Sequence, residues 1–183
     1  MQLKRSIPNI ISVLRIILSF GLLLTLDNKY LFSGLVLFIG LTDIADGYIA
    51  RKYNLVSKLG AKLDSLGDLV FCGMIIFILF YRYKWILAEN YTWFLIIVLL
   101  KISTAVISKI KTGEFLFIHT LANKFTGLVV FLAILIIPFF VAEALFLVVF
   151  LVAAIAAAEE LGIVILNKTP DINQKSIFAK PYK

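Results

Sequence analysis

The sequence predicts an all-α, polytopic membrane protein with six transmembrane helices and a short N-terminal surface helix, forming a single domain over residues 1–183. Composition gives the first reason, because 62% of the 183 residues are hydrophobic, 16% are charged and the mean hydropathy is +1.03. A soluble domain carries about a quarter charged residues, so this surplus of apolar surface requires lipid as its solvent. The second reason is that six segments stay apolar for about the 20 residues that a helix needs to cross a bilayer.

The apolar segments give the expected elements in order. Residues 1–6 carry two basic side chains and are expected to form the surface helix that precedes the first span. The six spans are expected at residues 7–26, 31–50, 63–81, 91–108, 121–140 and 142–166. Pro138 and Glu143 mark the turn between the last two spans, because proline breaks a helix and an isolated glutamate prefers the membrane interface. The polar residues 167–183 are expected to form a cytoplasmic tail.

Lysine and arginine are distributed unevenly among the segments that flank the spans. The termini and the connections at residues 51–62 and 109–120 hold most of them, whereas the opposite set of connections holds Lys29, Arg82 and Lys84. Cytoplasmic loops of membrane proteins carry the excess of basic residues. Both termini and these two connections are therefore expected in the cytoplasm of a multi-pass protein of the cell membrane. The same rule accounts for the formal net charge of +7, so no nucleic-acid partner is expected.

Four aspartates lie within the predicted spans, where a carboxylate is costly and normally has a partner or a function. Asp43 and Asp46 are three residues apart on the second span, and Asp64 and Asp68 are four apart on the third. These spacings place each pair on one helical face. The short basic connection that begins at Arg51 makes the two spans antiparallel neighbours, so both pairs lie at the cytoplasmic end and face each other.

Such a cluster predicts a metal site. Several carboxylates in a medium of low dielectric cannot all stay ionised without protons or cations to neutralise them. Oxygen ligands without histidine or cysteine favour Mg²⁺, Mn²⁺ or Ca²⁺ over zinc. Mg²⁺ typically shares its coordination between protein carboxylates and substrate phosphates. The cluster therefore indicates a site for a phosphate-bearing substrate, with Arg51 one turn beyond Asp46 to meet a phosphate or a nucleotide.

Residues 43–51 and 60–68 together carry a family resemblance. They match the pattern D-x-x-D-G-x-x-A-R, eight residues, G-x-x-x-D-x-x-x-D at all eight fixed positions and in every spacing. This pattern is the signature of the CDP-alcohol phosphotransferases, so the chain resembles that family of integral membrane enzymes. The motif covers about a seventh of the chain, and the six-span plan extends the similarity over nearly all of it.

The resemblance implies roles at matching positions. Asp43, Asp46 and Asp64 would bind two Mg²⁺ or Mn²⁺ ions, and Asp68 would act both as a nearby ligand and as the general base. The ions would polarise the diphosphate of the donor and stabilise CMP as the leaving group. The donor would be CDP-diacylglycerol or another CDP-alcohol, the acceptor a small polar alcohol, and the active site would face the cytoplasm.

The resemblance also implies a nucleotide pocket and an assembly. The residues that would shape the CDP pocket are Gly47, Ala50, Arg51 and Gly60. The family further suggests a homodimer surrounded by membrane lipids.

The acceptor stays open between glycerol 3-phosphate and serine. Residues 7–15 resemble the opening of phosphatidylglycerophosphate synthases, whereas residues 63–70 are similar to bacterial phosphatidylserine synthases. Ser65 occupies a position where glycerophosphate synthases more often have proline. A phosphorylated acceptor would need a pocket lined by basic residues. The basic residues that could line it are also explained by the ordinary excess of positive charge on the cytoplasmic side. Those candidates are Arg15, Lys101, Lys109, Lys111 and Lys124.

Other polar residues favour structural roles. His119 is expected at the surface or interface, and Asn123 and Lys124 either face the active-site cavity or cap the fifth span. Glu159 and Glu160 are expected to form a structural ion pair with Lys124 or Lys101 rather than to act in catalysis.

Three alternative functions also fit parts of the sequence. An aminoalcohol phosphotransferase would share the motif but use a soluble CDP-alcohol and diacylglycerol. A divalent-metal transporter also needs intramembrane carboxylates, although the aspartates cluster at one end and no inverted repeat is evident. A catalytically silent scaffold is disfavoured by the presence of Asp68.

Overall fold

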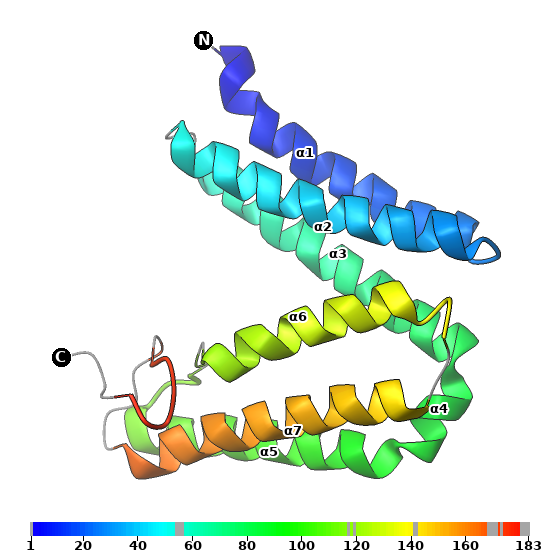
Figure 1. The fold of residues 1–183 in the computed structure, drawn as a ribbon. Helices are drawn as coiled ribbons and strands as arrows, with labels where there is room; N and C mark the ends of the chain where they lie inside the picture. Colours follow the sequence, from blue (N-terminus) through cyan, green and yellow to red (C-terminus); the bar gives the residue numbers. More distant parts are fainter. Residues whose placement is uncertain are drawn as a thin grey trace. The chain divides into compact units, whose positions relative to one another are not determined.

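The computed structural model describes residues 2–53, 57–116, 118, 120–140, 143–167, 172 and 174–179, without the side chains at positions 2–8, 50, 51 and 58 (Figure 1). Its regular elements are all helical, which confirms the all-α class for this part of the chain. The chain divides into two compact units. The first comprises Met1–Lys84 and Ile134–Phe139, and the second comprises Trp85–Ala133 and Phe140–Lys183. The assignment of residues 1–183 to a single domain stays a prediction.

The first unit is built from three long helices. They are α1 (Gln2–Gly21), which tightens into the 3₁₀ helix η1 (Leu22–Thr25), α2 (Lys29–Lys52) and α3 (Lys58–Arg82). Helix α1 packs against both α2 and α3 (Figure 1). Apolar side chains such as Val36, Ile39 and Ile78 are buried in this unit.

Side-chain caps fix where α2 and α3 begin. The side-chain oxygen of Asn28 accepts hydrogen bonds from the backbone N–H groups of Tyr30 and Leu31, both at 3.1 Å. The hydroxyl of Ser57 accepts one from the N–H of Gly60 at 3.0 Å. Both satisfy backbone donors that a helix start leaves without partners. The Ser57 cap ends the short connection between α2 and α3, which places the aspartates of these two helices at the same end of the unit.

The second unit contains α4 (Lys84–Glu89), α5 (Tyr91–Thr112), most of α6 (Leu121–Ile136) and α7 (Glu143–Leu166). Helices α5 and α7 pack side by side (Figure 1). Small buried residues on both helices, including Ser108, Ala156 and Ala157, allow a close approach. Helix α5 is capped at its C-terminal end by Gly113, whose φ of 81° suits glycine and whose N–H donates to the carbonyl of Lys109.

Four of the helices are long and apolar enough to cross a membrane by length and composition. Within the described residues these candidate spans are Lys29–Ile49, Leu59–Arg82, Tyr91–Thr112 and Glu143–Leu166. Large apolar side chains on them are exposed, as at Ile110 (78%) and Leu69 (69%), which suits lipid contact. The four helices lie at the predicted second, third, fourth and sixth spans, and the chain is a candidate multi-pass membrane protein.

The predicted first and fifth spans differ from the structure in length. They correspond to the shorter apolar helices Asn9–Thr25 and Leu121–Ile136. Pro138 explains the earlier end of the fifth, because proline and the residue before it disfavour helix. The six-span plan as a whole therefore stays a prediction.

The short N-terminal surface helix stays a prediction, because residues 2–6 are helical but form the start of one continuous helix, Gln2–Gly21. No glycine interrupts residues 2–20, although Pro8, in the second turn, removes one N–H donor from the helix.

Candidate active site

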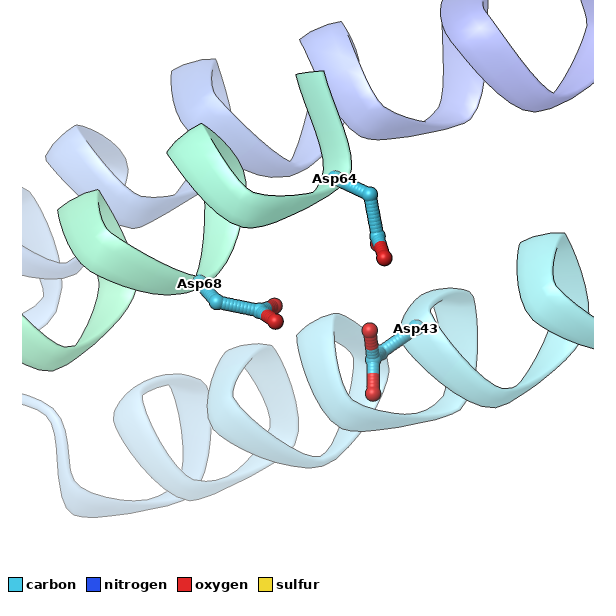
Figure 2. Close-up of side chains that lie close together, drawn as sticks. All are labelled: Asp43, Asp64 and Asp68. Atoms are coloured by element: carbon cyan, nitrogen blue, oxygen red, sulfur yellow. The ribbon is translucent and has the colours of Figure 1, made fainter. Parts of the chain in front are cut away.

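Three aspartates from two helices meet in the first unit. Asp43 projects from α2, and Asp64 and Asp68 project one turn apart from α3 (Figure 2). Each offers a carboxylate oxygen, and these three oxygens lie within 4.8 Å of one another. The side chains are half-exposed, at 49%, 48% and 57% respectively. The helical spacing and the short connection between α2 and α3 thus bring together three of the four predicted aspartates.

Asp46 does not belong to this group of three and is buried, with 4% of its surface exposed. Its Oδ2 accepts a hydrogen bond from the hydroxyl of Ser12 at 3.3 Å and pairs with Nη2 of Arg15. The three-residue spacing from Asp43 turns Asp46 toward α1 rather than fully toward the other three carboxylates.

Arg15 of α1 links all four aspartates. Its Nη1 lies 2.8 Å from Oδ1 of Asp43, 3.0 Å from Oδ1 of Asp64 and 2.8 Å from Oδ1 of Asp68. The side chain is 1% exposed, so the guanidinium lies on the buried side of carboxylates that are open on their other side.

Arg15 is one of the basic residues that the sequence suggests for an acceptor phosphate, and in the structure its guanidinium contacts the four aspartates. A signal was available, because an arginine inside an apolar segment needs a charged partner. The sequence did not show that this partner would be the aspartate cluster of two other helices.

The donor set fits a hard divalent cation. Carboxylate oxygens without sulfur or imidazole suit Mg²⁺ and Mn²⁺. One guanidinium offsets one of the four negative charges that the aspartates carry when ionised. The remaining negative charge, on carboxylates close together, favours a divalent ion at the exposed side. Asp43, Asp64 and Asp68 therefore form a group that could hold a metal ion.

The predicted nucleotide residues lie at the same end of α2 and α3. Gly47 and Gly60 are both partly buried. A Cβ at Gly60 would lie 2.9 Å from Oδ1 of Asn9 and 3.1 Å from the hydroxyl of Ser57, so glycine allows a close approach there. Ala50 and Arg51 continue α2, but their side chains lie outside the described part of the chain.

A second polar cluster lies in the second unit around Glu160. Its carboxylate pairs with Lys101, accepts a hydrogen bond from the N–H of Ile118 at 3.2 Å and another from Nδ2 of Asn123 at 3.2 Å. Glu160 is 3% exposed, and a buried carboxylate needs such partners. The predicted structural pair between Glu160 and Lys101 is confirmed.

The other polar residues of this unit differ from the sequence predictions or lie outside the described residues. Glu159 accepts from the hydroxyl of Ser176 at 2.9 Å instead of pairing with a lysine among the described residues. Thr120, rather than Asn123 or Lys124, caps α6 through the N–H of Asn123. His119 lies outside the described residues.

Two of the lysines suggested for an acceptor phosphate bind backbone carbonyls. Lys109 donates to the carbonyl of Gly113, and Lys111 donates to the carbonyls of Val164 and Ile165 at the end of α7. Basic side chains at helix C-termini commonly have this role. Together with the Lys101 pair, these contacts favour structural roles for three of the five basic candidates.

Comparisons with known proteins agree with the motif. A family model described as CDP-alcohol phosphatidyltransferase matches residues 5–158. A CDP-diacylglycerol--glycerol-3-phosphate 3-phosphatidyltransferase of Rickettsia felis is 37% identical over 87 residues, covering 43% of this chain and 46% of the relative. The protein of the same name from Aquifex aeolicus is 46% identical over 68 residues, covering 36% and 38%.

A relative with another acceptor in its name also matches. CDP-diacylglycerol--inositol 3-phosphatidyltransferase 1 of Arabidopsis thaliana is 38% identical over 79 residues, covering 43% of this chain and 35% of the relative. The matched segments thus span less than half the length of these curated relatives. No solved structure matches the chain.

Proposed function

The chain belongs to the CDP-alcohol phosphatidyltransferase family, and on that premise we propose that it transfers a phosphatidyl group from CDP-diacylglycerol to the hydroxyl of a small polar acceptor, releasing CMP. The observation that carries the proposal is the meeting of Asp43, Asp64 and Asp68, whose carboxylate oxygens lie within 4.8 Å of one another. Half-exposed carboxylates at one place on α2 and α3 suit a cation and a diphosphate that arrive together.

The proposed roles of the aspartates follow their positions. Asp43, Asp46 and Asp64 would hold two Mg²⁺ or Mn²⁺ ions, which offset the charge of the donor diphosphate and of the leaving CMP when they are bound. Asp68 accepts the proton of the acceptor hydroxyl as its oxygen bonds to the phosphorus that carries diacylglycerol. The bond from that phosphorus to the oxygen of CMP breaks, and CMP leaves with the electron pair. The half-exposed side chain of Asp68 is accessible to such an acceptor.

We assign the cytidine diphosphate to the surface beside the aspartates. Gly47 follows Asp46 directly on α2, and Gly60 precedes Asp64 by one turn on α3. Gly60 allows the close approach of Asn9 and Ser57 on this surface, and the motif adds Ala50 and Arg51 on the next turn of α2. A guanidinium at position 51 suits a phosphate group of the donor.

Glycerol 3-phosphate is the proposed acceptor, because it stands in the names of the relatives from Rickettsia felis and Aquifex aeolicus. Inositol, from the name of the Arabidopsis relative, and serine, suggested by residues 63–70, are the alternatives. Purified protein in CDP-diacylglycerol vesicles should convert radiolabelled glycerol 3-phosphate, but neither labelled inositol nor labelled serine, to labelled lipid. Labelled lipid from serine or inositol alone would reassign the acceptor. Turnover of a soluble CDP-alcohol with diacylglycerol alone would support the aminoalcohol reading.

We also propose that both termini and the aspartate end of α2 and α3 face the cytoplasm, because the basic residues concentrate there. Single cysteines at positions 58 and 29, in a Cys72→Ala background that removes the one native cysteine, test this orientation. An impermeant maleimide added outside cells should label position 29 and leave position 58 unlabelled. The reverse pattern would contradict the orientation. The homodimer stays a prediction that the mass of the protein in nanodiscs checks.

A further inference from the structure

Arg15 contacts every member of the aspartate cluster, yet it lies outside the motif that defines the cluster. We propose that Arg15 is a positioning residue, whose guanidinium holds one oxygen each of Asp43, Asp64 and Asp68 on the buried side and leaves their other oxygens for cations on the exposed side. This inference rests on the proposed function, since it assigns a task to Arg15 within the same metal-dependent site.

The contacts of Arg15 show which carboxylate oxygens it holds. Nη1 of Arg15 lies within 3.0 Å of Oδ1 of Asp43, Asp64 and Asp68, and Nη2 pairs with Oδ2 of Asp46. Arg15 therefore contacts one oxygen of each aspartate. Because Arg15 is 1% exposed while three of its partners are about half-exposed, the second oxygens are accessible from the opposite side.

The packing of the unit explains why an arginine of α1 has this role. The aspartates come from α2 and α3, and α1 packs against both of these helices. A guanidinium that bonds to aspartates of both helices links them and fixes how far apart their carboxylates lie. Charged hydrogen bonds of this kind orient metal ligands, and their loss typically lowers metal affinity about 10- to 100-fold.

Packing against α3 and contacts with the aspartates together hold the side chain of Arg15. A Cβ at Gly67 of α3 would lie 3.4 Å from Cδ and 3.5 Å from Nη1 of Arg15, so the arginine lies directly against the backbone there. Nε of Arg15 is buried without a hydrogen-bond partner among the described residues. A buried donor left without a partner is unfavourable, which indicates that contacts with the aspartates determine how the guanidinium is oriented.

Lysine cannot replace these contacts. A guanidinium is planar and presents five N–H donors in a fixed arrangement, whereas an ammonium is a compact charge on a flexible stem. Arg15→Lys therefore keeps the positive charge and removes the geometry. This distinguishes a positioning residue from a simple counter-charge, for which lysine would suffice.

The test is a Mn²⁺ titration of the purified full-length chain in nanodiscs, with free Mn²⁺ measured by electron paramagnetic resonance. We expect Arg15→Lys to bind Mn²⁺ about 10- to 100-fold more weakly than the wild type. Equal or tighter binding would overturn the inference. If the wild type binds no Mn²⁺, the proposed function itself fails and the inference fails with it. Wild-type binding that persists in Arg15→Lys overturns the inference alone.

A matched pair of substitutions at Gly67 tests the same inference if Arg15→Lys does not fold. The Cβ of Gly67→Ala would be in ordinary van der Waals contact with Arg15, whereas the extra methyl groups of Gly67→Val would displace the guanidinium. We expect Gly67→Ala to stay within about twofold of wild-type affinity and Gly67→Val to lose affinity as Arg15→Lys does. Helical circular dichroism without metal should be equal for the pair. Equal Mn²⁺ affinity of two folded variants would contradict the positioning role.

Discussion

Asp64→Asn should abolish metal-dependent CMP release from CDP-diacylglycerol. The substitution removes one negative charge from three carboxylates whose oxygens lie within 4.8 Å of one another. A divalent ion would then be held by fewer charged ligands, so its affinity should fall together with turnover. Loss of several kcal/mol of charge stabilisation corresponds to a rate decrease of about 10³-fold or more. Release of labelled CMP by purified variants measures this effect.

Asp27→Asn is the matched control for this experiment. Asp27 lies in the same unit, is 98% exposed, and pairs with Arg82 at 3.2 Å, away from the aspartate cluster. The same change from carboxylate to amide should leave CMP release at the wild-type level there, because an exposed pair contributes little. Asp43→Asn and Asp46→Asn should lose metal-dependent CMP release as Asp64→Asn does. Wild-type activity and metal dependence in any of these three variants would refute its assignment as a ligand.

Asp68→Asn should separate the base from the ligands. The amide keeps the shape and one oxygen of the carboxylate but cannot accept the proton of the acceptor hydroxyl. Turnover should fall by the roughly 10²- to 10⁴-fold typical of a lost general base, while donor binding survives better than in Asp64→Asn. CDP-diacylglycerol affinity and single-turnover CMP release, measured for both variants, test this difference.

Two results would contradict the role of Asp68 as the base. Near wild-type turnover in Asp68→Asn would show that the proton leaves by another route. Loss of donor binding as complete as in Asp64→Asn would make Asp68 chiefly a metal ligand. The two residues lie one turn apart on α3 and contact the same Nη1 of Arg15, so a difference between their variants reports chemistry rather than location.

The aspartate cluster could be predicted from sequence because its determinants are local. Periodicity alone places Asp64 and Asp68 on one face of a helix, and a short connection makes α2 and α3 consecutive helices with their aspartates at one end. The pair between Lys101 and Glu160 was predictable for a related reason, since two charges in apolar helices must find partners.

The contacts of Arg15 could not be predicted in this way, because they depend on tertiary packing. Arg15 is 31 residues from Asp46 and 53 from Asp68 in sequence, and only the packing of α1 against both helices brings them together. Spacing equally could not show that Asp46 would be buried against Ser12 while Asp43 stays half-exposed. Helix ends were also poorly predicted, since Pro138 shortens α6 and α1 begins at Gln2.

Metal dependence of CMP release by the wild-type chain tests the central claim most directly. Purified protein in CDP-diacylglycerol vesicles with glycerol 3-phosphate should release labelled CMP with Mg²⁺ or Mn²⁺. Release should stop in excess EDTA and return when the metal is restored, because the negative charge of the aspartate cluster would otherwise face that of the diphosphate. Full CMP release in excess EDTA would contradict the account. Mn²⁺ binding without CMP release from any CDP-activated donor would instead favour a transporter or a silent scaffold.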